Sequence, residues 1–198
     1  MAATLRGKCS RKFLHENMMK NVKNALFVIM MLTPFAASAQ NPLPKCEGTD
    51  AKAWNDCFGV NKTSDGILYE GGFKNGQYSY GGRLLMPNGD SYIGRLENGL
   101  PNGRGEAKLE SGEIYRGNFV NGELQGQGEQ VLSNGSTYKG TFKDSRKDGD
   151  GEVLAADGSK FVGKFANDKR NGRGVQYLPN GSVELEGVWK DDKFIGKN

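Results

Sequence analysis

Residues 115–137 read YRGNFVNGELQGQGEQVLSNGST, and residues 138–160 repeat the same plan as YKGTFKDSRKDGDGEVLAADGSK. The chain holds 30 glycines in 198 residues, well above the usual share of about 7%. Similarity at a fixed period is the signature of an architecture in which each copy is one supersecondary unit. Two glycine columns define a period of 23 residues: Gly66, Gly89, Gly112, Gly135, Gly158 and Gly181, and Gly71, Gly94, Gly117, Gly140 and Gly163, with Gly187 one residue late.

Each copy begins with an aromatic-x-Gly-x-aromatic pattern, as in Tyr115 to Phe119. Apolar residues at every second position are typical of a strand, and they place both rings and the intervening glycine on one face. Glycine weakens a strand and often marks a close approach. Here it leaves room for the flanking rings to lean inward. The pattern occurs at residues 69–73, 92–96, 115–119, 138–142, 161–165 and 185–189, with leucine replacing one aromatic in two of them.

Each copy also carries turn residues at two places. Asn134-Gly135 and its equivalents are typical of a type I′ hairpin, in which both central residues need a positive φ, so we predict a tight turn there. The second place has Asn121-Gly122, which drifts to Asp144-Ser145 in the next copy. Between the two turns lie a Gly-x-Gly motif and an apolar strand, except that Tyr80 replaces the leading glycine in the first copy.

A unit of Tyr-x-Gly-x-Phe, an Asn-Gly loop, Gly-x-Gly, an apolar strand and a closing Asn-Gly or Asp-Gly turn resembles the MORN repeat. The resemblance covers residues 63–198 in about six units, the last one incomplete. It implies an all-β protein in which tandem antiparallel hairpins form one elongated, single-layer, twisted sheet. Residues 42–59, which include Trp54 and Cys57, resemble the segment that precedes such arrays in exported proteobacterial proteins.

Residues 1–39 are typical of a leader, with a secretory signal peptide at about residues 18–39. This segment has a positively charged start, an apolar run at residues 25–32 and small residues ahead of Gln40. The apolar run is too short to span a bilayer, which needs about 20 residues. We therefore expect cleavage before Gln40 and export to the periplasm or the exterior of a Gram-negative bacterium. Residues 1–17 are either an artefact of start-site choice or a long charged leader.

An N-terminal cap is expected at residues 40–62, which contain Cys46 and Cys57, whereas Cys9 lies in the leader. In an oxidising exported compartment, two neighbouring cysteines and no others predict one disulfide. A zinc site is the competing interpretation, but two thiols without a nearby histidine are too few ligands. A lipoprotein anchor at Cys46 is disfavoured because Lys45 stands where a small residue is needed.

The residues after the leader lack the groups used in common catalysis. The only histidine is His15, in the leader, so no imidazole remains for nucleophilic or acid–base chemistry. Residues 103–105 read Gly-Arg-Gly but lack the Lys-Ser/Thr ending of a phosphate loop. Residues 1–39 hold six of the 27 basic and one of the 23 acidic residues, which leaves a net charge of −1 elsewhere. We expect no enzyme activity, cofactor or metal, and no nucleic-acid partner, since that needs a basic excess.

The aromatic positions form two columns along the predicted sheet, because equivalent residues of successive copies lie two strands apart, about 9 to 10 Å. No helix or second sheet is encoded to cover this face. Either the rings bind a protein partner or a second copy, or curvature lets them pack on one another as a core. The candidate interaction face is Tyr69, Phe73, Tyr92, Tyr115, Phe119, Tyr138, Phe142, Phe161, Phe165 and Trp189; the candidate core partners are Leu85, Val131, Leu154 and Tyr177.

These features together predict a non-catalytic scaffold of the cell envelope that acts through protein interaction or self-association. The alternative is peripheral binding to a phospholipid surface, which needs clustered bases. Bases such as Arg116 and Lys139 form only a thin stripe that points away from the rings. We also expect weak self-association at the C-terminal end, because the strand at residues 185–189 ends the array as an open edge beside Trp189.

Overall fold

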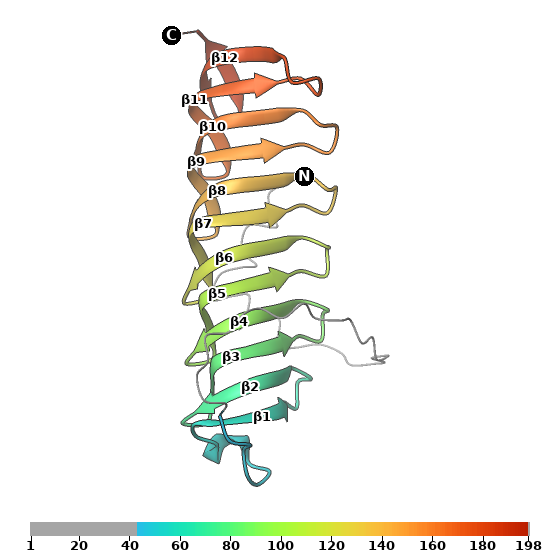
Figure 1. The fold of residues 1–198 in the computed structure, drawn as a ribbon, viewed down its shortest axis with the longest axis vertical. Helices are drawn as coiled ribbons and strands as arrows, with labels where there is room; N and C mark the ends of the chain where they lie inside the picture. Colours follow the sequence, from blue (N-terminus) through green and yellow to red (C-terminus); the bar gives the residue numbers. More distant parts are fainter. Residues whose placement is uncertain (1–42, 198) are drawn as a thin grey trace.

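The computed structural model describes residues 43–197 as one elongated antiparallel sheet of 13 strands (Figure 1). Strands pair strictly in chain order, so the predicted all-β array of tandem hairpins is confirmed. A short 3-10 turn, η1 (Ala51–Ala53), precedes the sheet. The predicted signal peptide lies outside the described residues. The strands are β1 (Cys57–Lys62), β2 (Leu68–Lys74), β3 (Gln77–Leu85), β4 (Ser91–Glu97), β5 (Leu100–Lys108), β6 (Ile114–Val120), β7 (Glu123–Val131), β8 (Thr137–Lys143), β9 (Arg146–Leu154), β10 (Lys160–Ala166), β11 (Lys169–Tyr177), β12 (Val183–Lys190) and β13 (Lys193–Gly196).

The type I′ turns lie at the second turn position of each repeat, and not at the position where they were predicted. Both central residues have a positive φ after the shorter strands, as at Asn75 (50°) and Gly76 (69°), so the type I′ turns lie there. At the predicted place only the glycine does, as at Gly89 (90°). The Gly89 N–H donates to the Met86 carbonyl and the Met86 N–H to the Asp90 carbonyl, both at 2.9 Å. This is a type I turn followed by a left-handed glycine. The prediction failed because Asn-Gly suits both turns.

Each type I′ turn is hydrogen-bonded to the long strand of the preceding hairpin. The second turn residue donates its N–H to that strand, as Ser145 does to the Leu124 carbonyl at 3.0 Å. Where this residue is not glycine, its side chain accepts a bond in return. The Ser145 hydroxyl accepts from the Leu124 N–H at 2.9 Å, and the Asp168 carboxylate accepts from the Lys147 N–H at 3.0 Å. These bonds offset the strain of a positive φ and explain the drift away from Asn-Gly.

Each hairpin bends sharply at its central glycines. The ring centroids of Tyr138 and Phe142 are 5.1 Å apart, whereas positions four apart in a straight strand are separated by about 13 Å. The register shifts between Gly140 and Phe142, which marks a β-bulge at the bend. The bend divides the sheet lengthwise into two wings. The tyrosine wing carries Tyr69, Tyr92, Tyr115, Tyr138, Phe161 and Leu185; the phenylalanine wing carries Phe73, Leu96, Phe119, Phe142, Phe165 and Trp189 and ends in the type I′ turns.

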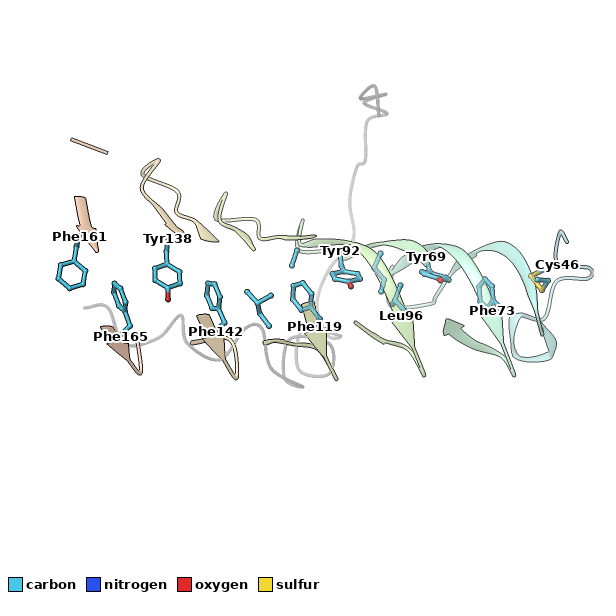
Figure 2. Close-up of a cluster of buried hydrophobic side chains, with 14 of the residues drawn as sticks. Cys46, Tyr69, Phe73, Tyr92, Leu96, Phe119, Tyr138, Phe142, Phe161 and Phe165 are labelled. Carbon is cyan, nitrogen blue, oxygen red and sulfur yellow. A yellow bond between two sulfur atoms is a disulfide. The ribbon is translucent and has the colours of Figure 1, made fainter. Parts of the chain in front are cut away.

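The two wings face each other across a trough, and their rings form one continuous core along it (Figure 2). Neighbouring rings meet edge to face, as Tyr138 does with Phe142 and Phe165, each at 5.1 Å. Aromatic quadrupoles favour this geometry. The Tyr138 hydroxyl donates to the Thr141 carbonyl at 2.9 Å, so its polar end is satisfied inside the core. The single sheet thus encloses its own core.

The residues that pair with the tyrosine-wing rings differ from the prediction by one position. Tyr69 and Tyr92 both pair in register with Leu84, which is 2% exposed, and not with Leu85. Leu154, also predicted for the core, is 43% exposed. Because side chains alternate along a strand, a slip of one residue exchanges the two faces. The observed column is Leu84, Ala107, Gln130, Val153 and Gln176, in place of Leu85, Val131, Leu154 and Tyr177.

Most tyrosine-wing rings lie directly against glycine backbone. A Cβ atom at Gly82 would lie 2.5 Å from the Tyr69 hydroxyl, and one at Gly105 would lie 2.2 Å from the Tyr92 hydroxyl. No side chain fits at such distances. The second glycine of Gly-x-Gly is therefore required by the space that the ring occupies.

Residues before β1 close the N-terminal edge of the sheet. Cys46 is disulfide-bonded to Cys57, as predicted. Lys45 bridges to Phe58 along the outer side of β1, where the Cys46 N–H donates to the Phe58 carbonyl at 2.8 Å and the Phe58 N–H to the Pro44 carbonyl at 2.7 Å. This edge is therefore partly paired.

Tyr80, the residue that departs from Gly-x-Gly, fastens this cap to the array. Its φ is 65°, in the left-handed region that the other repeats occupy with glycine. The Tyr80 hydroxyl donates to the Asp56 carboxylate. Its ring has room because residue 72 is glycine, where a Cβ would lie 2.8 Å from both the Tyr80 ring and Leu43. The first repeat thus has a large residue, Tyr80, where the others have glycine, and a glycine at position 72 makes room for the ring that holds the cap.

The C-terminal end is less open than predicted. Strand β13 pairs with β12 from Val188 to Lys190 and covers the half of β12 that contains Trp189. Trp189 is 4% exposed and its ring centroid lies 5.4 Å from that of Phe194. The expected exposure of Trp189 is therefore wrong, whereas self-association at this end stays a prediction. Within β12, only residues 183–187 lack a neighbouring strand on this side in the described chain, and the outer side of β13 also has none.

Substitutions at the adjacent glycines Gly81 and Gly82 test the contact between the Tyr69 ring and the glycine backbone. We expect Gly82→Ala to lower the free energy of unfolding by about 1 to 3 kcal/mol, because its methyl group meets the Tyr69 ring. The matched control is Gly81→Ala, where a Cβ meets nothing within 4 Å. It should be neutral or stabilise by about 0.4 to 1 kcal/mol. Urea unfolding followed by circular dichroism measures both, and equal midpoints would contradict the assigned contact.

Candidate functional site

The predicted interaction face is almost entirely buried. Its exposed fractions run from 0% at Tyr69 to 5% at Phe165, with Tyr115 half-buried. The cause is the bend at the glycines, which turns the two wings toward each other. These rings therefore build the core, which was the second of the two interpretations, and they do not form the candidate interaction face.

One column of the phenylalanine wing changes character along the array. In the first three repeats it holds Tyr78, Pro101 and Leu124, each paired in register with a core residue. In the next two it holds Lys147 and Arg170, paired with Phe142 and Phe165. The trough is thus closed by apolar side chains in its first three repeats and lined by cations in the next two, and Phe194 opposite Trp189 is apolar again in the last hairpin.

The second half of the trough contains an open groove of about 560 Å³, which we call the C-terminal groove. It combines an apolar floor with a charged rim, as ligand-binding clefts commonly do. Strands β9 to β12 and the turns between them supply its walls. The floor includes Val153, Phe161, Phe165, Leu185 and Trp189, and the rim includes Lys147, Asp168, Arg170, Glu184 and Asp192.

Lys147 brings an ammonium group into this groove. Its Nζ lies 5.1 Å from the centroid of the Tyr138 ring. Burial lowers the pKa of Lys147, and the carboxylates of Asp168, Glu113 and Asp192 act against that shift. Within residues 43–197 the ammonium forms no hydrogen bond or ion pair. Its three N–H donors are therefore available to an acceptor that a ligand brings.

Arg170, a rim residue, is held in place against the aromatic floor of the groove. Its guanidinium lies 4.1 Å from the Trp189 ring centroid and 5.4 Å from that of Phe161. It also donates to the Asp192 carbonyl at 3.0 Å and to the Gln176 side chain at 3.1 Å. By contrast, the buried indole N–H of Trp189 has no acceptor among the described residues, which is uncommon in a protein core.

Acids neutralise the basic stripe on the outer face. Arg116 Nε lies 2.6 Å from Glu106 and its Nη1 lies 3.2 Å from Glu129, while Lys139 Nζ lies 3.4 Å from Glu129. Exposed pairs of this kind contribute only about 0 to 1 kcal/mol each. Their consequence is electrostatic, because anionic lipid attracts uncompensated bases. No observation here favours the phospholipid alternative.

Other chemistry is sparse in the part of the chain that the structure describes. Residues 43–197 contain no histidine. No three or more Cys, Asp and Glu side chains in this range are placed to hold a metal ion. None of its helices is long and apolar enough to cross a membrane.

The sequence matches the MORN repeat at residues 69–79, 92–113, 115–137, 138–160 and 161–183, which together cover 102 of the 198 residues. The chain belongs to the MORN repeat family. The last two MORN matches include Lys147, Phe161 and Arg170, so the C-terminal groove is built largely from MORN repeats.

Two solved structures resemble the MORN array weakly. The TCP domain of Drosophila melanogaster SAS-4 (dCPAP), solved with a proline-rich motif of Ana2 (dSTIL), is 18% identical over 80% of this chain and 98% of that chain, with a TM-score of 0.41. The TCP10 domain of Danio rerio CPAP, solved with a peptide of Danio rerio STIL, is 19% identical over 66% and 67%, with a TM-score of 0.23. Neither likeness bears on the function of this chain. No curated protein matches the sequence.

The sequence does contain a signal for the groove. Residues 78, 101, 124, 147 and 170 follow the 23-residue period and read Tyr, Pro, Leu, Lys, Arg. The change from apolar to basic at a constant position marks where the trough opens. Interpreting it required knowing that this column faces the trough, which depends on the bend at the glycines.

The buried tyrosines predict sensitivity to alkali. Burial raises the pKa of the Tyr138 phenol, as do the nearby acids Asp148 and Asp150. Because the folded state holds this proton more tightly than the unfolded state, its contribution to stability is full below about pH 10 and is lost as the pH rises further.

We expect Tyr138→Phe to fold, since Phe161 occupies the same place in the next repeat, and to lose about 1 kcal/mol at neutral pH with the hydrogen bond to Thr141. Above about pH 10 its free energy of unfolding should fall less steeply than that of the wild type. Urea unfolding from pH 8 to 11 measures this. Identical pH dependence would contradict the assignment.

Proposed function

We propose that this MORN protein is a non-catalytic interaction module whose C-terminal groove binds an extended segment of a partner protein. The observation that carries the proposal is the replacement of Leu124, which closes the trough in the third repeat, by Lys147 and Arg170 in the next two. This change opens the groove without altering the surrounding sheet.

The chemistry of the groove suits a polypeptide. The floor offers Phe161 and Leu185 to apolar side chains, and the Lys147 ammonium, which has no hydrogen bond or ion pair among residues 43–197, offers donors to backbone carbonyls. The groove runs across strands β9 to β12, so it favours an extended segment over a compact small molecule.

Two features indicate that this half of the array is not optimised for stability. A leucine at position 147 would fill the trough as Leu124 does, whereas Lys147 is a desolvated cation. The Trp189 N–H is buried without an acceptor in the described chain. Departures of this kind from core packing are typical of sites that bind something.

We further propose that the protein acts after export, in the periplasm or outside a Gram-negative cell, as an envelope scaffold. Residues 18–39 support this with the pattern of a signal peptide. The Cys46–Cys57 bond also supports it, because disulfides persist in oxidising compartments.

Site-directed photo-crosslinking tests the groove. A photoreactive phenylalanine analogue replaces Ser159, which lines the groove, or Lys139 on the outer face as the control. We expect a protein adduct in cells from position 159 and none from position 139. Adding Lys147→Leu should abolish the adduct without lowering the melting temperature, because the leucine refills the trough. Adducts of equal yield at both positions, or adducts that survive Lys147→Leu, would contradict the proposal.

Intact mass of the protein recovered from the envelope tests export. We expect a chain that begins near Gln40, with a mass that increases by two hydrogen atoms per molecule on reduction of Cys46 and Cys57. An uncleaved chain, or one whose mass does not respond to reductant, would argue against an exported, oxidised protein.

A further inference from the structure

Part of the sheet edge at the C-terminal end has no neighbouring strand among the described residues. Strand β13 reaches only Val188, so residues 183–187 of β12 lie beyond it. Every earlier strand of the array has its tyrosine-wing half paired on both sides, apart from β1. This short edge is therefore a place where another extended chain can hydrogen-bond.

The direction of the free backbone groups follows from the pairing. In an antiparallel sheet, residues along a strand bond alternately to the two neighbours. Phe58 bonds outward to the cap, and its neighbour at Val60 does the same by alternation. A row of paired residues crosses the sheet from Val60 on β1 to Glu186 on β12. Along this row, pairs that exchange backbone hydrogen bonds alternate with pairs that do not. Val175 and Glu186 are a pair that does not, so the N–H and C=O of Glu186 point toward the open side.

The same edge borders the C-terminal groove. Glu184 and Leu185, which precede Glu186, both line the groove. A strand added here would extend the tyrosine wing by one place. The residue of the added strand that lies opposite Glu186 would point to the outer face. Because side chains alternate between faces, the residues on either side of it would point into the groove.

Charge selects the residue opposite Glu186. Along the line of paired residues on the outer face, acids and bases alternate from Glu106 through Arg116 and Glu129 to Lys139. Arg116 contacts acids on both neighbouring strands. Glu186 pairs with Val175 on one side and faces the open edge on the other. A basic residue on an added strand would give Glu186 an ion-pair partner on its open side.

A second copy of this edge is a poor occupant. Two copies of β12 pairing antiparallel about Leu185 would place Glu186 of one copy opposite Glu184 of the other. Like charges directly opposite each other destabilise a sheet. The insertion of Glu184 as a bulge in β12 further disfavours a long regular pairing.

We propose that the edge at residues 183–187 binds a partner protein by strand addition, and that the partner segment carries a Lys or Arg opposite Glu186 with apolar residues on both sides. Backbone hydrogen bonds hold the segment, the base pairs with Glu186, and the apolar side chains enter the groove beside Leu185. This inference rests on the proposed function for the polypeptide nature of the partner.

Capped, fluorescent peptides test it, with sequences Thr-Val-Arg-Val-Thr and Thr-Val-Glu-Val-Thr, by anisotropy at low salt. We expect the arginine peptide to bind about tenfold more tightly. Glu186→Lys should reverse this order. Glu110→Lys, which changes an exposed turn acid far from the edge, is the matched control and should preserve it. A preference that Glu186→Lys leaves unchanged would overturn the charge rule.

Glu186→Pro removes the outward N–H while leaving the side of β12 that faces β11 intact, so it should fold and lose both peptides. Circular dichroism and the melting temperature verify the fold. Binding retained by Glu186→Pro but lost in Lys147→Leu would overturn the edge and leave the groove standing. Loss in Glu186→Pro alone would support the edge and count against the groove. A dimer in sedimentation that Glu186→Pro abolishes would make the occupant a second copy and overturn the proposal.

Discussion

A phenol ring seated on the bare backbone of glycine is the contact on which this fold depends. Any Cβ at Gly71 or Gly82 would overlap the Tyr69 ring, and the same holds for the equivalent glycines of Tyr92 and Tyr138. A lone sheet has no second layer to cover its apolar face. By letting each hairpin bend over its own ring, the glycines turn one layer into two facing wings with a shared core. Ring contacts along the trough and the polar ends of the tyrosines follow from this geometry.

Much of the architecture could be predicted from the 23-residue period. The glycine columns and the alternating aromatic residues were enough for the strands, their order and the face that carries Tyr115 and Phe119. The Cys46–Cys57 bond was also predictable. What the pattern could not supply was the bend, because alternation describes a straight strand and says nothing of an angle within it. Without the bend the rings could be either a surface or a core, and Leu85 was placed in the core where Leu84 lies.

Turn chemistry shows a second limit of local reasoning. Asn-Gly occurs at both ends of the early hairpins, and only the backbone angles separate the type I′ turn at Asn75 from the type I turn before Gly89. Conversely, Asp144-Ser145 departs from the Asn-Gly sequence but still forms a type I′ turn. This turn is stabilised because Ser145 exchanges two hydrogen bonds with Leu124 of the preceding hairpin. Tyr80 is a comparable case, in which an apparent defect of the first repeat holds the cap through Asp56.

The two ends of the array are built differently. Because strands pair strictly in chain order, the N-terminal end can form before the C-terminal end. Each hairpin needs only the one made before it, as in other linear repeat proteins, so contacts stay local in sequence and folding can keep pace with the emerging chain. The disulfide-bonded cap is complete first and offers a template for the next strand. The wall that contains Leu185 and Trp189 forms after the strands that precede it in the chain. A chain shortened before Leu185 would therefore keep a folded array but lack one wall of the C-terminal groove, so folding of the repeats and assembly of the groove are separable steps.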